Sequence, residues 1–382
     1  MGGRARERAC IHHEPDGAVR VTFGADTVRI EPDAQADHTR ERADFAAWLL
    51  LPVAMRRGVD LLIEGAGSDD TVRNANRLAH IWSQWMPGHF SAVDVAFTRT
   101  WSGATPGTAG DLCFYSGGVD STYGILRRFR AGARQSLLTV HGLEYRHGDR
   151  ARFADLLEKT RPFAERVAMR RLLVRTDVKD LYRHYRANPK GNDVVHGFVL
   201  AAMGFLYAER FGRAVILADH RADQQFAVHP YGTNAVTNPL FSDGVFALCT
   251  EGDDVTRAEK SVLLLESQEA LESLTFCVDY SARPHNCGRC QKCIRTKAMF
   301  FAATGRIPEF CIDKTLAPDC LDAFDLSVTT QRTYFLDLHS WALRSGRLDQ
   351  IPGLQAVYER HFPREPRRSL VKRIKRFLRG KK

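Results

Sequence analysis

Long apolar runs are missing from this sequence. No stretch of about 18 consecutive apolar residues occurs, which is the length that a membrane-spanning helix needs. The charged start from Met1 to Glu7 is not followed by the apolar core of a secretion signal. Internal repeats and low-complexity tracts are also lacking, so the composition favours neither a disordered nor a fibrous protein. We therefore expect a folded, cytoplasmic protein.

Excess charge is scarce outside the last part of the chain. The net charge is +10 over 382 residues, but residues 364–382 carry ten Lys or Arg against one Glu, which leaves about +1 for the rest. Enzymes of nucleic acids usually spread basic groups over a face of the fold, because affinity comes from neutralised phosphates. The near-neutral body makes a nucleic acid a weaker expectation than a small-molecule substrate.

The basic tail over residues 364–382 is amphipathic. One helical face carries the apolar residues Leu370, Val371, Ile374, Phe377 and Leu378. A basic amphipathic helix favours peripheral association with an anionic membrane surface, or docking on an acidic partner. A solvated tail without a partner is the alternative.

Hydrophobic periodicity divides the rest of the chain into three parts. Residues 1–105 predict an α+β unit, with a β-hairpin over 18–31, helices over 43–57 and 69–86, and strands over 59–64 and 91–98. Residues 106–315 predict an α/β domain with a parallel sheet, because strands over 111–115, 136–141, 171–175 and 213–218 alternate with helices over 121–130, 149–168 and 194–211. Residues 316–363 form a helical extension.

The first strand of the α/β part runs into a glycine-rich loop and then a helix. The loop reads Ser116-Gly117-Gly118-Val119-Asp120-Ser121. A helix N-terminus favours an anion, and glycines let the backbone approach phosphate oxygens. Serine hydroxyls add donors, whereas Asp120 would hold Mg²⁺ against the phosphates or cap the helix. A Gly-Gly turn with ordinary caps is the structural alternative.

This string resembles the signature of the PP-loop ATP pyrophosphatases, which are related to the adenine nucleotide alpha hydrolases. It is not a Walker A loop, since no Gly-Lys-Ser or Gly-Lys-Thr follows. The resemblance implies a Rossmann-like fold and ATP cleavage between the α and β phosphates. It further implies adenine contacts near Val140, His141 and Gly142, and a lysine near the phosphates, for which Lys260 is the candidate. His141 could equally be a hydrogen-bonded histidine at a strand end.

Four of the nine cysteines lie close together in the sequence. They are Cys277, Cys287, Cys290 and Cys293. Four soft ligands suit a tetrahedral Zn²⁺, and Gly288 permits a tight knuckle whose amides point at sulfur. An iron–sulfur cluster and unliganded thiols are the alternatives. The cluster, followed by Arg295, resembles the 7-cyano-7-deazaguanine synthase-like PP-loop enzymes over about residues 111–297.

Further polar residues follow the fourth strand of the parallel sheet. Asp219, His220 and Asp223 could orient substrate or Mg²⁺, with a solvated loop as the alternative. Thr256 and Glu259 fit a capping box that starts a helix, and Asn192 and His196 are weaker candidates.

Three functions follow from these motifs. The leading expectation is an ATP-dependent ligase or synthase that adenylates a carboxylate or amide oxygen of a small molecule. Pyrophosphate leaves, and ammonia or another nucleophile then displaces AMP, giving amidation or nitrile formation. The alternatives are a base-modifying, thiolation-type enzyme and a nucleotide-binding regulator without turnover. Catalysis would rest on Asp120, Ser121 and Lys260.

Overall fold

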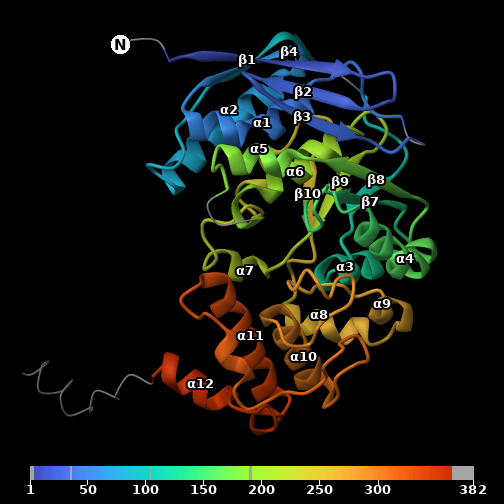
Figure 1. Cartoon of the computed structure of the whole chain (residues 1–382), viewed down its shortest axis with the longest axis vertical. Coiled ribbons are helices and arrows are strands. Elements are labelled where there is room, and N and C mark those ends of the chain that lie inside the picture. Colours follow the sequence, from blue (N-terminus) through green and yellow to red (C-terminus); the bar gives the residue numbers. More distant parts are fainter. Residues whose placement is uncertain (1–3, 35–36, 104, 189–191, 364–382) are drawn as a thin grey trace, which may run out of the picture.

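The computed structural model describes residues 4–34, 37–103, 105–188 and 192–363. These residues form an elongated α/β molecule, with a layered upper part and a helical lower part (Figure 1). The basic tail over 364–382 lies outside the described residues. In the described ranges, no helix is both long enough and apolar enough to cross a membrane.

One ten-stranded sheet runs through the upper part. Its strands are β1 (Arg6–His13), β2 (Val19–Phe23), β3 (Asp26–Glu31), β4 (Asp60–Ser68), β5 (Val95–Trp101), β6 (Asp111–Phe114), β7 (Gln135–His141), β8 (Arg171–Thr176), β9 (Arg213–Leu217) and β10 (Leu248–Glu251). Their order is β10-β9-β6-β7-β8-β3-β2-β1-β4-β5. The first five strands in this order, from β10 through β9, β6 and β7 to β8, pair parallel with one another. Strand β3 continues the sheet by pairing antiparallel with β8. The α/β class and a Rossmann-like parallel sheet are therefore confirmed.

The order in which the chain adds strands to the sheet reverses beside β6. It passes from β6 to β7 and β8, and later returns to β9 on the other side of β6. Such a switch point leaves a crevice beyond the carboxyl ends of the strands, where ligands of open α/β sheets bind. The loop after β6 and the residues after β9 both lie at this crevice.

Helices cover both faces of the sheet and build a separate layer beneath it. They are α1 (Asp44–Arg57), α2 (Asp69–Trp85), α3 (Val119–Arg130), α4 (Arg150–Val167), α5 (Val178–His184), α6 (Asn192–Phe205), α7 (Ala222–Gln225), α8 (Arg257–Leu264), α9 (Gln268–Glu272), α10 (Gln291–Thr304), α11 (Thr329–Arg344) and α12 (Leu354–His361). Short 3-10 turns occupy Asn238–Leu240, Cys320–Ala323 and Leu348–Gln350. Helices α8, α10, α11 and α12 lie together in the lower part of Figure 1.

The N-terminal unit and the parallel half share one hydrophobic core. Helix α1 is apolar around nearly its whole circumference and is buried between the sheet and α6. The ring of Trp48 packs edge-on against Phe205 of α6, with centroids 5.6 Å apart, and against Phe241 at 5.4 Å. Burial of such aromatic side chains dominates core energetics. The expected unit over 1–105 is thus continuous in sheet and core with the part that follows it.

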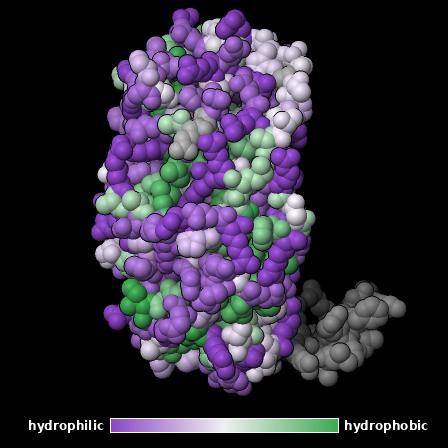
Figure 2. Space-filling model, turned by 90° about the vertical axis from the view of Figure 1, so that its right-hand side faces the viewer, coloured by the Kyte–Doolittle hydropathy of each residue, from purple (hydrophilic) through white to green (hydrophobic). Residues whose placement is uncertain are grey.

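Most expected elements occur, with differences at the edges. Strands β1 and β10 and helices α5, α7, α9 and α10 were not predicted. Strand β1 is rich in charged residues, and β10, α5, α7 and α9 are short. The helix expected over 194–211 begins at Asn192 and ends at Phe205. Figure 2 shows one face on which hydrophilic side chains predominate and hydrophobic ones occur in separate groups.

Candidate functional site

The glycine-rich loop joins β6 to α3 at the switch point of the sheet. Gly118 is the N-cap of α3, and no side chain caps this helix terminus. Gly117 adopts a positive φ of 75°, and its carbonyl accepts a hydrogen bond of 2.8 Å from the amide of Thr275. The loop is thereby fixed to the segment before the cysteine cluster. An uncapped helix N-terminus of this kind presents backbone donors to an anion.

The two loop serines face each other across the turn. Their hydroxyl oxygens are 3.3 Å apart, and the amide of Gly118 donates to Ser116 Oγ at 3.3 Å. Ser121 Oγ donates to the carbonyl of Gly118 at 3.1 Å. The two hydroxyls therefore lie side by side in the loop, where Ser116 is exposed and Ser121 is buried.

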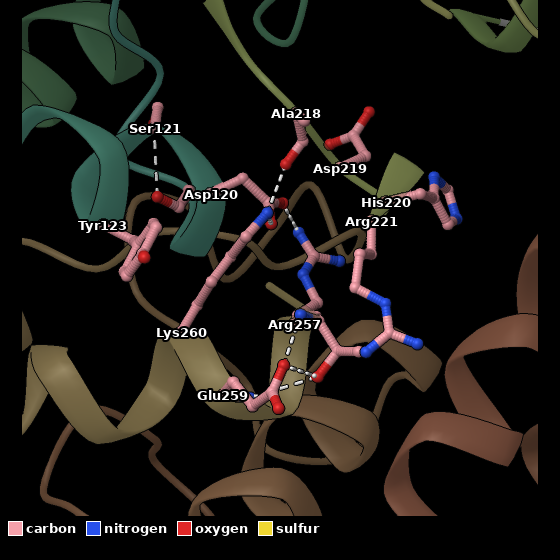
Figure 3. A network of polar contacts seen from close by, with 12 residues as sticks. Asp120, Ser121, Tyr123, Ala218, Asp219, His220, Arg221, Arg257, Glu259 and Lys260 are labelled. Carbon is pink, nitrogen blue, oxygen red and sulfur yellow. Dashed lines mark hydrogen bonds and ion pairs between the residues drawn. The ribbon is translucent and has the colours of Figure 1, made fainter. Parts of the chain in front are cut away.

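Asp120 is the centre of a buried ionic network (Figure 3). Lys260 extends from α8 and donates to Asp120 Oδ1 at 3.1 Å and to the carbonyl of Ala218 at the end of β9. Arg257, one turn earlier on α8, donates to Asp120 Oδ2. Asp120 lies in the first turn of α3 but does not cap it, so the capping alternative is wrong. Its carboxylate instead balances two cations in a crevice.

The capping box that starts α8 explains why these cations point at the loop. Thr256 is the N-cap, its hydroxyl accepts from the amide of Glu259, and the Glu259 carboxylate accepts from the amide of Thr256. Satisfied end groups fix the first turn of a helix. Lys260 is fully buried in the second turn, so its long side chain can reach only toward α3 and β9. The predicted capping box is confirmed.

A second group of cations stacks on Tyr334 from α11. The guanidinium carbon of Arg295 lies 3.8 Å from the centroid of the Tyr334 ring, and that of Arg257 lies 4.9 Å away. The ring of His220 stacks on the same tyrosine at 4.6 Å. The Nε atoms of both arginines and Nε2 of His220 are buried without a hydrogen-bond partner in the described residues. Buried polar atoms of this kind are costly unless something binds them.

Electrostatics separate the members of this group. Burial, with the neighbouring Arg257, lowers the pKa of Arg295 to about 10, so its guanidinium stays charged at neutral pH. Burial also lowers the pKa of His220 to about 3, which keeps that ring neutral. The pKa of Arg257 is raised, because Asp120 outweighs the effect of burial. The crevice therefore combines two arginines and a lysine with one neutral histidine.

The polar residues expected after β9 differ in their surroundings: Asp219 and His220 are held by neighbouring side chains, whereas Asp223 is exposed. Asp219 Oδ2 accepts a hydrogen bond of 2.6 Å from Tyr231, and nearby Arg257 lowers its pKa despite burial. In Figure 3 the ring of His220 points away from Lys260. Asp223 is exposed and pairs with Arg221 at 2.6 Å, so the solvated-loop interpretation fits this residue. The side chain of Asn192 lies outside the described residues, whereas His196 Nε2 is 3.1 Å from the hydroxyl of Thr233.

The end of β7 is tightly engaged in packing. His141 Nε2 hydrogen-bonds to the carbonyl of Arg146 at 2.8 Å, and its ring stacks on Phe153 at 4.1 Å. A Cβ on Gly142 would lie 2.0 Å from the carbonyl oxygen of Thr176, so glycine is required there by β8. Val140 packs half-buried against the main core. The alternative of a hydrogen-bonded strand-end histidine describes His141.

The four cysteines converge in space. Their sulfur atoms all lie within 4.8 Å of one another, with Cys277 and Cys290 3.7 Å apart and Cys287 and Cys293 3.9 Å apart. The amides of Arg289 and Cys290 point at the sulfur of Cys287, at 3.4 and 3.2 Å. This cluster could hold a metal such as zinc, because four sulfur ligands suit tetrahedral coordination.

Gly288 makes the knuckle of this cluster possible. Its φ is 81°, and a Cβ there would lie 2.0 Å from the carbonyl oxygen of Asp313. The hydrogen bond between Cys290 and Cys293 lowers the pKa of the first thiol and raises that of the second. Four thiolates this close would repel one another, so full deprotonation needs a cation. The predicted knuckle with sulfur-directed amides is confirmed.

Comparison of the chain with protein-family models, curated proteins and solved structures finds no match. The geometry of the site therefore carries the functional argument.

Two members of the crevice were missed by the sequence analysis. Arg257 could have been found, because it precedes Lys260 by three positions and so shares its helical face. Tyr334 gave no local signal, since it belongs to a helix more than 70 residues away that meets α8 only in the folded chain. It supplies the flat surface on which Arg257, Arg295 and His220 are ordered.

Proposed function

We propose that this protein is an ATP pyrophosphatase of the PP-loop kind that activates a small-molecule acid or amide by adenylation. The observation that carries the proposal is the convergence of an uncapped helix N-terminus, two serine hydroxyls and Lys260 at the switch point of a parallel sheet. Each of these groups favours a phosphate, and together they suit the departing pyrophosphate.

The reaction has two steps. An oxygen of the acceptor attacks the α phosphorus of ATP, and pyrophosphate leaves onto the loop formed by residues 116–121. A nucleophile such as ammonia then attacks the activated carbon and displaces AMP. Lys260 and Arg257 now neutralise Asp120 and would share their charge with the phosphates once ATP is bound. Preorganised donors of this kind lower the barrier because they need no reorientation when charge develops.

Zinc and magnesium, the two metals expected from the sequence, differ in how far the described residues could bind them. Zinc fits the four-cysteine cluster as a structural ion, held by Cys277, Cys287, Cys290 and Cys293. In the described residues, no group of three carboxylate or histidine ligands surrounds Asp120, which already accepts bonds from two cations. Mg²⁺ would therefore have to arrive on the phosphates of ATP, which is its usual mode in such sites.

The decisive test is the identity of the nucleotide products. The full chain is incubated with ATP, Mg²⁺ and a metabolite extract, and the nucleotides are separated. AMP and pyrophosphate in equal amounts are expected. ADP and phosphate would contradict the proposal, whereas tight ATP binding without turnover would favour a regulator. Product formation that requires RNA or DNA would favour the base-modifying alternative.

A further inference from the structure

A cavity of about 570 Å³ lies between the N-terminal unit and the parallel half of the sheet. Its walls come from α1, the segment after α2, the loop after β7, and helices α5 and α6. It is separate from the crevice at the glycine-rich loop, because it shares no lining residue with the group around Asp120 and Lys260. The size is that of a typical small-molecule site.

The charged residues that line this cavity have one sign, and Glu144, which follows the lining residue Leu143, acts electrostatically on Lys179 from beside it. The lining contains Arg56, Lys179, Arg183 and Arg186 together with two histidines, and none of the described residues that line the cavity is acidic. Within the described residues, neither Arg56 nor Arg186 forms an ion pair, whereas Arg183 pairs with Asp180 at 2.6 Å. Gathering cations around one space is unfavourable unless an anion offsets their repulsion.

Buried polar atoms in the walls also lack partners. Arg56 Nε and Asn188 Oδ1 are shielded from solvent and have no hydrogen-bond partner within the described part of the chain. Burial and the adjacent Arg56 lower the pKa of His89, which favours its neutral form, and burial lowers the pKa of Lys179 as well. Unpaired buried groups in the walls point to a ligand that is polar as well as anionic.

One wall of the cavity lies close to the residues that follow β9, at the carboxyl end of the parallel strands. His196 lines the cavity, and its ring lies 5.5 Å from that of Tyr231, whose hydroxyl bonds to Asp219 at 2.6 Å. Asp219 directly follows Ala218, the carbonyl partner of Lys260. The cavity is therefore connected to the crevice by packed side chains at the carboxyl end of β9.

We propose that this cavity binds a multiply charged anionic group, of the phosphate-ester or polycarboxylate class, through Arg56, Lys179 and Arg186. Packed side chains separate the cavity from the crevice, so the anion would be a ligand distinct from ATP that binds beside the proposed active site. Arg56 belongs to α1, so this role gives the N-terminal unit a part in binding that ligand.

The test measures anion binding to the full chain in the absence of ATP. Inorganic phosphate and citrate are titrated by calorimetry at low ionic strength, where exposed charges are least screened. We expect the tighter probe to bind about tenfold or more weakly to Arg56→Gln and to Lys179→Gln, since a charge-assisted hydrogen bond is lost. The probe that binds more tightly separates the phosphate class from the polycarboxylate class.

Two variants serve as controls. Arg161→Gln removes the same charge from the exposed face of α4, a helix that contributes no residue to the cavity lining, and should leave binding unchanged. Ser121→Ala alters the glycine-rich loop, which is itself proposed to bind phosphate, so it should leave the binding of citrate unchanged. Unfolding temperatures of all variants verify that the fold persists.

Three outcomes would overturn the inference. The first is that neither probe binds the unaltered chain at about 10 mM, which is weaker than the weakest specific binding we expect. The second is that Arg161→Gln weakens anion binding as much as the cavity variants do. The third is that only Ser121→Ala weakens anion binding, which would place the anion on the glycine-rich loop. Because no ATP is present, a failure to produce AMP would sink the proposed function and leave this result intact.

Discussion

The glycine-rich loop over residues 116–121 and the cysteine cluster pack on the same hydrophobic core, but one is an open site and the other a closed one. In the cluster, four sulfurs face one another and backbone amides point inward, so the site is closed. In the crevice, two cations pair with the carboxylate of Asp120, and Nε of Arg257, Nε of Arg295 and Nε2 of His220 lack hydrogen-bond partners within the described residues. A closed ligand set stabilises a fold, whereas an open set of charged groups is suited to chemistry.

This comparison predicts that the two sites respond differently to substitution. Changes in the cluster should reduce stability first and activity only as a consequence. Changes at the glycine-rich loop should reduce activity while the fold persists.

The largest expected effect is on the cluster. Cys290→Ser removes one of four sulfur ligands, and a structural zinc contributes on the order of 10 kcal/mol of binding free energy to folding in small zinc domains. We expect the purified chain to hold one zinc, and the variant to lose it together with a large part of its thermal stability. Metal analysis and calorimetry measure both. Cys320→Ser, outside the cluster, is the matched control and should keep the metal. Iron with acid-labile sulfide would contradict the zinc assignment.

The second effect concerns the loop. Ser121→Ala removes a hydroxyl of the loop, and loss of one preorganised donor typically costs about 10² to 10³ in rate. We expect the rate of AMP formation to fall by this amount, with an unfolding temperature close to that of the unaltered chain. Ser345→Ala is a close control, because its hydroxyl also bonds to the carbonyl three residues earlier at 3.1 Å. Equal losses of activity in both variants would contradict a specific role of the Ser121 hydroxyl in the reaction.

The two loop glycines allow stability and ATP binding to be separated within the glycine-rich loop itself. A Cβ on Gly117 would lie 2.4 Å from Thr275 Cγ2 at a positive φ, so Gly117→Ala should lower the free energy of unfolding by about 1 to 3 kcal/mol. Gly118 has an ordinary φ of −72°, and the nearest atom to its Cβ would be Ser116 Oγ at 3.3 Å.

Gly118→Ala should therefore keep most of the stability yet weaken ATP binding, because its Cβ crowds the surface that approaches the phosphates. Urea unfolding and equilibrium ATP binding distinguish the two variants. A Gly118→Ala chain that binds ATP normally would argue against close approach at this residue.

The smallest expected effect at neutral pH comes from His220, whose titration affects stability only as the pH falls. Burial lowers its pKa from 6.5 to about 3, so the folded chain keeps the ring neutral while the unfolded chain protonates it. This contribution to stability is present above pH 6.5 and is lost as the pH falls toward 3. His220→Phe preserves a ring on Tyr334 but removes the titration, and should lose less stability over that range. Parallel pH profiles for the two chains in urea unfolding would disprove the assignment.

Local motifs predicted the positions of the main groups, because their geometry is set by neighbours in the chain. The strand-loop-helix pattern placed Ser116 to Ser121, the Thr256–Glu259 box oriented Lys260, and the Cys-x2-Cys-x2-Cys spacing gathered the sulfurs. The sequence could not indicate that β3 pairs with β8, which joins the N-terminal unit to the parallel sheet. The stacking of Arg295 on Tyr334 and the cavity beside Arg56 likewise depend on long-range packing.

Isotope exchange tests the central claim most directly. Adenylation is reversible, so labelled pyrophosphate should enter ATP when the chain is given an ammonia-depleted metabolite extract that supplies the acceptor but not the nucleophile. We predict exchange that requires the extract and falls about 10² to 10³-fold in Ser121→Ala. Label that enters ATP from phosphate instead of pyrophosphate, or exchange that is unchanged in Ser121→Ala, would contradict ATP cleavage at this loop.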